Sequence, residues 1–298
     1  MKKHQLPNSK VALYEYGDPS GDPLFFFHGW PGSGRQAALL DVPGQQNGFR
    51  IIAPDRPGIG GSTRLAERNL AGFPAHLAEL ADVLELPRFS MLGVSGGGPY
   101  VLACASRLQD RVQSGAVVCG APPIAELQHH KTLSPLYQFL LWLFHRRPRL
   151  VRNLFAMARP FLMWRDAYQF LPPLRHLLPG PDRDILSDRD TFEKVFVCNQ
   201  DAFLDVDGLF EDAALYAVPW GLRLDAISTP LHFWHGVEDS NFHWSLAEEL
   251  AARLPTATLR IIPDEGHFSL PIKHGSAILA QLRTANTAMD ACGAAVAV

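Results

Sequence analysis

Short apolar runs that end at glycine or proline recur along this chain of 298 residues, and they constrain its fold more than any other feature. The runs lack the alternation of apolar and polar residues typical of half-exposed strands, so they indicate strands buried on both faces of a sheet. Between them, apolar residues recur at helical spacing. The predicted strands cover residues 24–27, 50–53, 89–94, 116–119, 231–234 and 259–262, and the clearest helices cover 74–86, 99–108 and 244–254. This alternation predicts an α/β fold with a mostly parallel central sheet flanked by helices.

One long region interrupts the alternation. From residue 123 to 219 the apolar spacing is helical and no run resembles a strand, which predicts an all-helical insertion, here called the cap segment. The core would then consist of residues 1–122 and 220–298. Because the flanking strands end at the same edge of the sheet, the cap segment should lie over the carboxyl ends of the strands. Ligands bind at that edge in open α/β sheets.

Composition excludes several classes of protein. With 47% hydrophobic and 19% charged residues the chain is globular, and its net charge of −3 argues against nucleic acid as a partner. We find no apolar run long enough to span a membrane and no secretory signal. The four cysteines lie far apart, which favours free thiols in a reducing compartment, a cytoplasmic location and no metal site. Arginine outnumbers lysine 21 to 6, which is typical of a GC-rich bacterial source.

Charges in the cap segment are strongly separated. Residues 127–165 contain seven basic and no acidic side chains, whereas residues 182–212 contain ten acidic and three basic ones. The two stretches could pack together through complementary faces. Alternatively, the basic stretch could form an apolar, basic rim that attracts amphiphilic substrates or makes peripheral contact with a membrane. Residues 136–144 are apolar nearly all round, so they could form either a buried lid helix or an interfacial one.

A candidate nucleophile stands between a predicted strand and a predicted helix. Residues 93–97 read Gly-Val-Ser-Gly-Gly, which matches the G-x-S-x-G pattern in the strand–turn–helix context that it needs. A sharp turn there would lift the Ser95 hydroxyl clear of the sheet, and Gly93 and Gly97 would let strand and helix pack closely. An ordinary glycine-rich turn is the alternative.

A nucleophilic serine needs a base, and the base needs a carboxylate to orient it. His267 follows the last predicted strand, at the edge of the sheet where Ser95 would emerge. Asp239 follows the preceding strand and is favoured over its neighbour Glu238.

Other residues at strand ends receive structural interpretations. His28 and His235 each precede a glycine in a tight turn, so both are interpreted as structural. Asp55 precedes the candidate nucleophile in the chain and reads as the start of a turn that braces a loop. No acid follows the strand that ends at Cys119.

These motifs together resemble the α/β-hydrolase superfamily over essentially the whole chain. The matching pieces are residues 28–32, residues 55–62, the turn at Ser95, the His-Gly-x-x-Asp run ending at Asp239, and Gly266-His267. The resemblance implies Ser95 as nucleophile, His267 as general base and acid, and Asp239 as orienting acid. It also implies an oxyanion hole formed by the backbone N–H groups of Trp30 and Gly96, with no cofactor. A serine at the nucleophile position excludes relatives that use aspartate, such as haloalkane dehalogenases and epoxide hydrolases.

The leading hypothesis is a cofactor-independent serine hydrolase that cleaves a carboxylic ester or related acyl bond in an apolar or amphiphilic small molecule. The same three side chains could instead serve C–C bond hydrolysis, N-terminal peptidase or perhydrolase chemistry. A non-catalytic ligand-binding protein on this scaffold is a further alternative. The sequence leaves the oligomeric state open.

Overall fold

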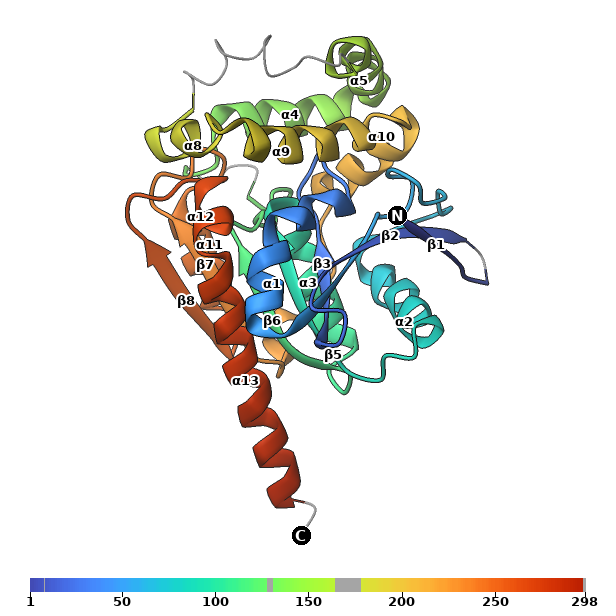
Figure 1. The fold of residues 1–298 in the computed structure, drawn as a ribbon. Coiled ribbons are helices and arrows are strands. Elements are labelled where there is room, and N and C mark those ends of the chain that lie inside the picture. The colour runs from blue at the N-terminus through green and yellow to red at the C-terminus, as the bar shows by residue number, and fades with distance from the viewer. Residues whose placement is uncertain (8, 128–130, 164–177, 297–298) are drawn as a thin grey trace.

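The computed structural model describes residues 1–7, 9–127, 131–163 and 178–296 (Figure 1). Eight strands form one sheet in the order β1-β2-β4-β3-β5-β6-β7-β8. The strands are β1 (Lys2–Gln5), β2 (Lys10–Gly17), β3 (Asp22–Phe27), β4 (Phe49–Pro54), β5 (Phe89–Val94), β6 (Val112–Val118), β7 (Leu231–Gly236) and β8 (Ala257–Ile262). The six strands from β3 to β8 pair in parallel, which confirms the predicted α/β fold.

The structure differs from the sequence prediction in two strand features. The antiparallel pair β1 and β2 was not predicted, because β1 is short, polar and mostly exposed, and only β2 contributes apolar side chains to the core. In addition, β8 is not buried on both faces. It lies at the edge of the sheet, and its exposed and half-buried residues alternate along the strand.

The central strands are buried because helices cover both faces of the sheet. In β3, Phe25 and Phe27 pack in one apolar cluster, while Leu24 and Phe26 pack in another on the opposite face. The first face carries α2 (Phe73–Val83), α3 (Gly98–Arg107) and α11 (Trp244–Ala251). The second carries α13 (Gly275–Val296) and α1 (Asp41–Asn47), which contacts β2, β4 and α13. The short helix α12 (Ser269–Lys273) precedes α13.

The elements described between β6 and β7 are helical, as predicted for the cap segment. They are α4 (Pro135–Arg146), α5 (Pro148–Leu162), α8 (Gly180–Ile185), α9 (Arg189–Ala202) and α10 (Val206–Ala214), followed by the short 3-10 turns η4 (Leu215–Ala217) and η5 (Leu224–Ala226). Figure 1 shows α4, α5, α8, α9 and α10 together at one end of the molecule, above the sheet. The exact boundaries of the cap segment stay a prediction.

Acidic side chains of the cap segment form ion pairs mostly with arginines of the core rather than with the basic stretch, among the pairs that the structure describes. Arg152 pairs with Asp207 across the two stretches. By contrast, Asp201 pairs with Arg35 of the core, and Asp212 pairs with two arginines of the core. Complementary packing of the two stretches therefore explains only a small part of the charge separation.

None of the helices in the described part of the chain has the length and apolarity needed to cross a bilayer. Cys104, Cys119 and Cys198 are free and buried, as expected from their spacing.

Candidate active site

The predicted sharp turn at Ser95 is present. Ser95 opens the 3-10 turn η3 (Ser95–Gly97) between β5 and α3, and its φ of +53° lies in the left-handed region that side chains rarely adopt. A Cβ atom at Gly93 would lie 2.4 Å from the carbonyl oxygen of Gly97, and one at Gly97 would lie 2.0 Å from that of Phe27. Only glycine fits at these two positions, so the G-x-S-x-G pattern reflects a real steric requirement.

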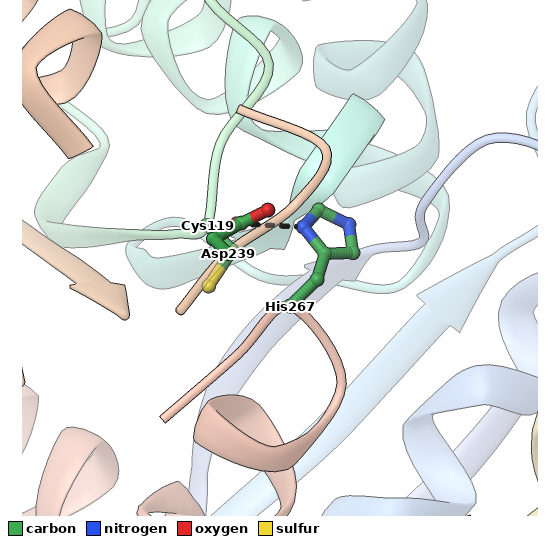
Figure 2. A group of neighbouring side chains, drawn as sticks. All are labelled: Cys119, Asp239 and His267. Carbon is green, nitrogen blue, oxygen red and sulfur yellow. Dashed lines mark hydrogen bonds and ion pairs between the residues drawn. The ribbon is translucent and has the colours of Figure 1, made fainter. Parts of the chain in front are cut away.

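Three side chains from separate loops form a continuous hydrogen-bonded chain. His267 Nε2 lies 2.9 Å from Ser95 Oγ, and its Nδ1 lies 2.8 Å from Asp239 Oδ2. Figure 2 shows the His267 and Asp239 side chains joined in this way. Because β7 and β8 are neighbours in the sheet, the loops that follow them bring these two residues together. The competing Glu238 is exposed.

Asp239 is held as a buried carboxylate. Its Oδ1 accepts hydrogen bonds from the backbone N–H groups of Asn241 and Phe242, at 2.8 and 3.0 Å. Burial opposes its charge, but the attraction of His267 and the hydrogen bonds from His267 and His235 outweigh this effect and hold the pKa of Asp239 well below its usual range. For His267, burial likewise opposes the charged form, yet the Asp239 carboxylate outweighs it and raises the pKa of the imidazole.

His235 belongs to this cluster, although the sequence indicated only a structural turn. Its Nε2 lies 2.8 Å from the carbonyl oxygen of Phe242 and 3.3 Å from Asp239 Oδ2. The Nε2–H group therefore braces both the carboxylate and the loop that carries it. Its position four residues before Asp239 is the signal that could have placed it here.

The backbone at Gly96 lies close to that of Trp30, the two residues predicted to form the oxyanion hole. A Cβ atom at Gly96 would lie 3.1 Å from the backbone nitrogen of Trp30 and 2.9 Å from its Cβ. The preceding N–H group, that of Gly29, donates to Gln36 Oε1 at 2.6 Å. Within the described residues, the Trp30 N–H group has no acceptor, so it is available to a ligand.

Arg56, which the sequence did not single out, fixes the loop that carries Trp30. Its guanidinium donates to the carbonyl oxygens of His28 and Gly29, the latter at 3.0 Å. Burial and the nearby Arg56 charge hold the pKa of His28 well below its usual value. The neutral ring of His28 accepts from the backbone N–H of Arg56 at Nε2 (3.3 Å) and donates from Nδ1 to the Gly29 carbonyl oxygen (2.9 Å). The adjacent Asp55 accepts from the N–H groups of Gly34 and Gly61, which agrees with the predicted bracing turn.

Asp212 of α10 neutralises Arg56 from the cap segment. Its carboxylate accepts from Arg56 at 2.7 Å, from Arg68 at 2.5 Å and from Tyr100 Oη at 2.9 Å, and the side chains of Arg56 and Asp212 are at most 1% exposed. Burial disfavours its charge, but Arg56 and Arg68 outweigh burial and hold the pKa of Asp212 below its usual range.

Two further cap residues hold the backbone beside Ser95 and His267. Buried Asp182 of α8 accepts hydrogen bonds from the N–H groups of His267, Phe268 and Ser269, each at 2.9 Å. Tyr216 Oη donates to the carbonyl oxygen of Gly96 at 2.7 Å. Nothing in the sequence distinguishes Asp182 from the other nine acids of its stretch.

The chemistry of the neighbouring thiol does not favour a metal. Ligand atoms of Cys119, Asp239 and His267 lie within 4.8 Å of one another (Figure 2). However, burial and the Asp239 charge raise the pKa of the Cys119 thiol well above its usual value, which disfavours the thiolate that binds metals. The facing atoms of His267 and Asp239 are already engaged with each other.

Two cavities meet at Ser95, Trp30 and Asn241. The first, called the histidine-side cavity, has a volume of about 100 Å³ and is lined also by His267, Gln36, Asn199, Phe268 and Ile272. The second, called the cap-side cavity, has a volume of about 160 Å³. It is lined by Gly96 and by mainly apolar side chains, including Tyr137, Leu140, Leu141, Phe144, Val151 and Phe155.

Comparison with known proteins establishes the family. A family model described as the alpha/beta hydrolase fold matches residues 22–273, so the chain belongs to this family, as its motifs predicted.

Individual relatives are distant. A non-heme chloroperoxidase from Burkholderia pyrrocinia is 28% identical over 121 residues, which cover 39% of this chain and 44% of that protein. The chain thus spans less than half the length of this relative. A putative carbamate hydrolase, RutD, from Caulobacter sp. is 26% identical over 80% of this chain and 87% of its own. A thermophilic esterase structure from Thermogutta terrifontis superposes with a TM-score of 0.64 at 19% identity, covering 97% of this chain and 99% of that one, and shows a shared fold.

Proposed function

We propose that this protein is a serine hydrolase that cleaves carboxylic esters through an acyl-enzyme, without a cofactor. The observation that carries the proposal is the chain of contacts from Ser95 Oγ through His267 to Asp239, with distances of 2.9 and 2.8 Å. It begins on a residue with positive φ, next to the point where the backbones of Trp30 and Gly96 approach each other. This combination is what nucleophilic acyl transfer requires.

In the proposed reaction, Ser95 Oγ attacks the ester carbonyl while His267 Nε2 takes the hydroxyl proton. The N–H groups of Trp30 and Gly96 donate hydrogen bonds to the oxyanion of the tetrahedral intermediate. Collapse of this intermediate breaks the C–O bond, and His267 returns the proton to the departing alcohol. Water, deprotonated by His267, then attacks the acyl carbon. The bond from this carbon to Ser95 Oγ breaks, His267 returns the proton to Ser95 Oγ, and the acid is released.

Covalent labelling tests the nucleophile directly. A fluorophosphonate probe should label the protein at Ser95, and Ser95→Ala should abolish the label. Turnover of p-nitrophenyl esters, but not of aminoacyl-naphthylamides or vinylogous diketones, is expected from the same preparation. Labelling that survives Ser95→Ala would contradict the proposal. Preferred turnover of the amide or diketone would instead support the peptidase or C–C hydrolase alternative.

The pH dependence should report His267. The general base works only when neutral, so kcat/KM should rise with pH through a midpoint above the ordinary histidine value of 6.5, because Asp239 raises the pKa of His267. Asp239→Asn should lower the midpoint, since it removes the charge that stabilises the imidazolium, and should lower kcat by about 10⁴-fold. A profile measured from pH 5 to 9 checks both. A wild-type midpoint below that of Asp239→Asn would rule out this assignment of the base.

The two cavities divide the substrate between them in this proposal. The departing alcohol must reach His267 Nε2 to be protonated, so it occupies the histidine-side cavity, which His267 lines. The acyl group then extends past Gly96 into the cap-side cavity. Because that cavity is mostly apolar, we infer an apolar acyl group as the preferred substrate.

Acyl-chain length should therefore control the rate. Each methylene buried in the cap-side cavity contributes about 0.8 kcal/mol, so kcat/KM should rise about fourfold per methylene until the cavity is full. Leu140→Trp, which fills part of this cavity, should move the optimum to shorter acids. The matched variant Ile272→Trp, in the histidine-side cavity, should leave the acyl optimum unchanged and reduce turnover of bulky alcohols instead. Initial rates on p-nitrophenyl and alkyl esters of straight-chain acids measure both preferences. If Ile272→Trp shifted the acyl optimum and Leu140→Trp reduced turnover of bulky alcohols, the acyl group and the alcohol would occupy the opposite cavities.

A further inference from the structure

The outer side of two cap helices is apolar and exposed. On α5, Leu150, Leu154, Met157 and Phe161 are between 45% and 76% exposed, and their spacing of four, three and four residues places them on one stripe of the helix. On α4, three more large side chains are between 48% and 63% exposed. We call these seven side chains the apolar cap face: Leu136, Phe139, Trp142, Leu150, Leu154, Met157 and Phe161. Figure 1 shows both helices at the end of the molecule that lies away from the sheet.

Unpaired positive charge accompanies this face. Arg146, Arg147 and Arg149, at the junction of α4 and α5, are exposed and have no acidic partner within the described ranges. Nearby Arg152, in contrast, pairs with Asp207. Residues 127–165 contain no aspartate or glutamate, so acids that neutralise this end of the cap segment must come from other segments, as Asp207 does for Arg152.

We propose that the apolar cap face docks on the surface of an anionic lipid bilayer. Exposed aromatic and aliphatic side chains on a helix, flanked by arginines, can insert at the boundary of headgroups and acyl chains while the guanidinium groups pair with lipid phosphates. A second copy of the chain fits this face less well. A two-fold symmetric contact would set the same arginines against each other, without acids to neutralise them.

The same helices connect this surface to the candidate site. Leu140 and Phe144 of α4, and Val151 and Phe155 of α5, line the cap-side cavity with their inward sides. An acyl chain that partitions into the bilayer would therefore be concentrated next to the helices that form the cavity wall. Docking itself does not depend on the chemistry at Ser95, so the two proposals can fail separately.

Vesicle sedimentation of the full-length protein tests docking. The wild type should sediment with vesicles of phosphatidylcholine and phosphatidylglycerol in equal parts, and about tenfold more weakly with pure phosphatidylcholine or at high salt. Met157→Glu/Phe161→Glu should weaken binding to both vesicle types by at least about tenfold. Arg146→Gln/Arg147→Gln/Arg149→Gln should lose the preference for the anionic ones. The control Val42→Glu/Val83→Glu replaces exposed apolar side chains outside the cap segment and should bind as the wild type does.

Thermal melts and hydrolysis of a water-soluble ester should be unchanged in all three variants, because the replaced side chains are exposed and lie outside the cavities. Sedimentation of the wild type that is the same with and without vesicles would overturn the proposal. A second outcome would also overturn it: the wild type forms a concentration-dependent dimer but does not bind vesicles, and Met157→Glu/Phe161→Glu abolishes the dimer. The apolar cap face would then bind a second copy of the chain.

Discussion

Ser95→Ala is expected to lower kcat for ester hydrolysis by about 10⁴- to 10⁶-fold, the largest effect that we predict for any single replacement. The reason is that the remaining site can bind substrate and polarise its carbonyl but has no nucleophile to form the acyl-enzyme. His267→Ala should cost nearly as much, because Ser95 Oγ would then lack the base that lies 2.9 Å away. The double variant should be no slower than either single one, since both side chains serve the same step. Steady-state kinetics on one p-nitrophenyl ester measure all three.

A second serine on the same strand–turn–helix unit controls for this experiment. Ser106 of α3 donates to the carbonyl oxygen of Ala103, at 2.7 Å, and takes no part in the contacts around His267. Ser106→Ala should retain wild-type kcat. Because the replacement removes only a hydroxyl group and keeps the Cβ atom, Ser95→Ala should melt close to the wild type. Undiminished hydrolysis by folded Ser95→Ala would rule out the proposed mechanism. If the effects of Ser95→Ala and His267→Ala multiplied in the double variant, the two side chains would act in separate steps.

The parts of the fold that sequence predicts best are those where one physical cause acts alone. A strand such as β5, buried over its whole length, is apolar at most positions, so its bounds at Phe89–Val94 could be predicted to the residue. At the sheet edge this requirement disappears. Burial in β8 alternates, and β1 is nearly all exposed, so tertiary pairing rather than composition defines these strands.

The residues of the candidate site likewise fall into two groups, those that the sequence predicts and those that it does not. Ser95 directly follows β5, and Asp239 and His267 lie in the loops after β7 and β8, so chain order with parallel topology is enough to place them at one edge. The cap residues Asp182 and Asp212 contact the site only because α8 and α10 pack over it in one particular arrangement. A local sequence pattern does not indicate such long-range packing. The sequence shows the separation of charge within the cap segment, but it does not predict the buried contacts of Asp212 with Arg56 and of Asp182 with the loop that carries His267.

Asp212→Ala is expected to lower the free energy of unfolding by about 3–5 kcal/mol, the largest loss of stability that we predict. The variant would leave the guanidinium of Arg56, which is 1% exposed, buried without its carboxylate. It should also lower kcat/KM, because Arg56 holds the carbonyl oxygens of His28 and Gly29 and so positions the N–H group of Trp30. In the double variant Arg56→Met/Asp212→Leu part of the stability should return, since the Arg56 charge is removed together with its carboxylate and only Arg68, which is 7% exposed, still lacks its partner, whereas kcat/KM should stay low. Urea denaturation and ester kinetics on the same preparations separate the two effects.

The neighbouring residue Glu211 provides the matched control. It pairs with Arg64 on the same turn of α10, but these side chains are 32% and 46% exposed, so water screens the pair. Glu211→Ala should cost less than about 1 kcal/mol and leave kcat/KM unchanged. Equal losses of stability for Asp212→Ala and Glu211→Ala would contradict the assignment of a buried ion pair. Recovery of full activity in the double variant Arg56→Met/Asp212→Leu would show that the loop carrying Trp30 holds its conformation without Arg56. The cap segment would then support this loop by packing alone.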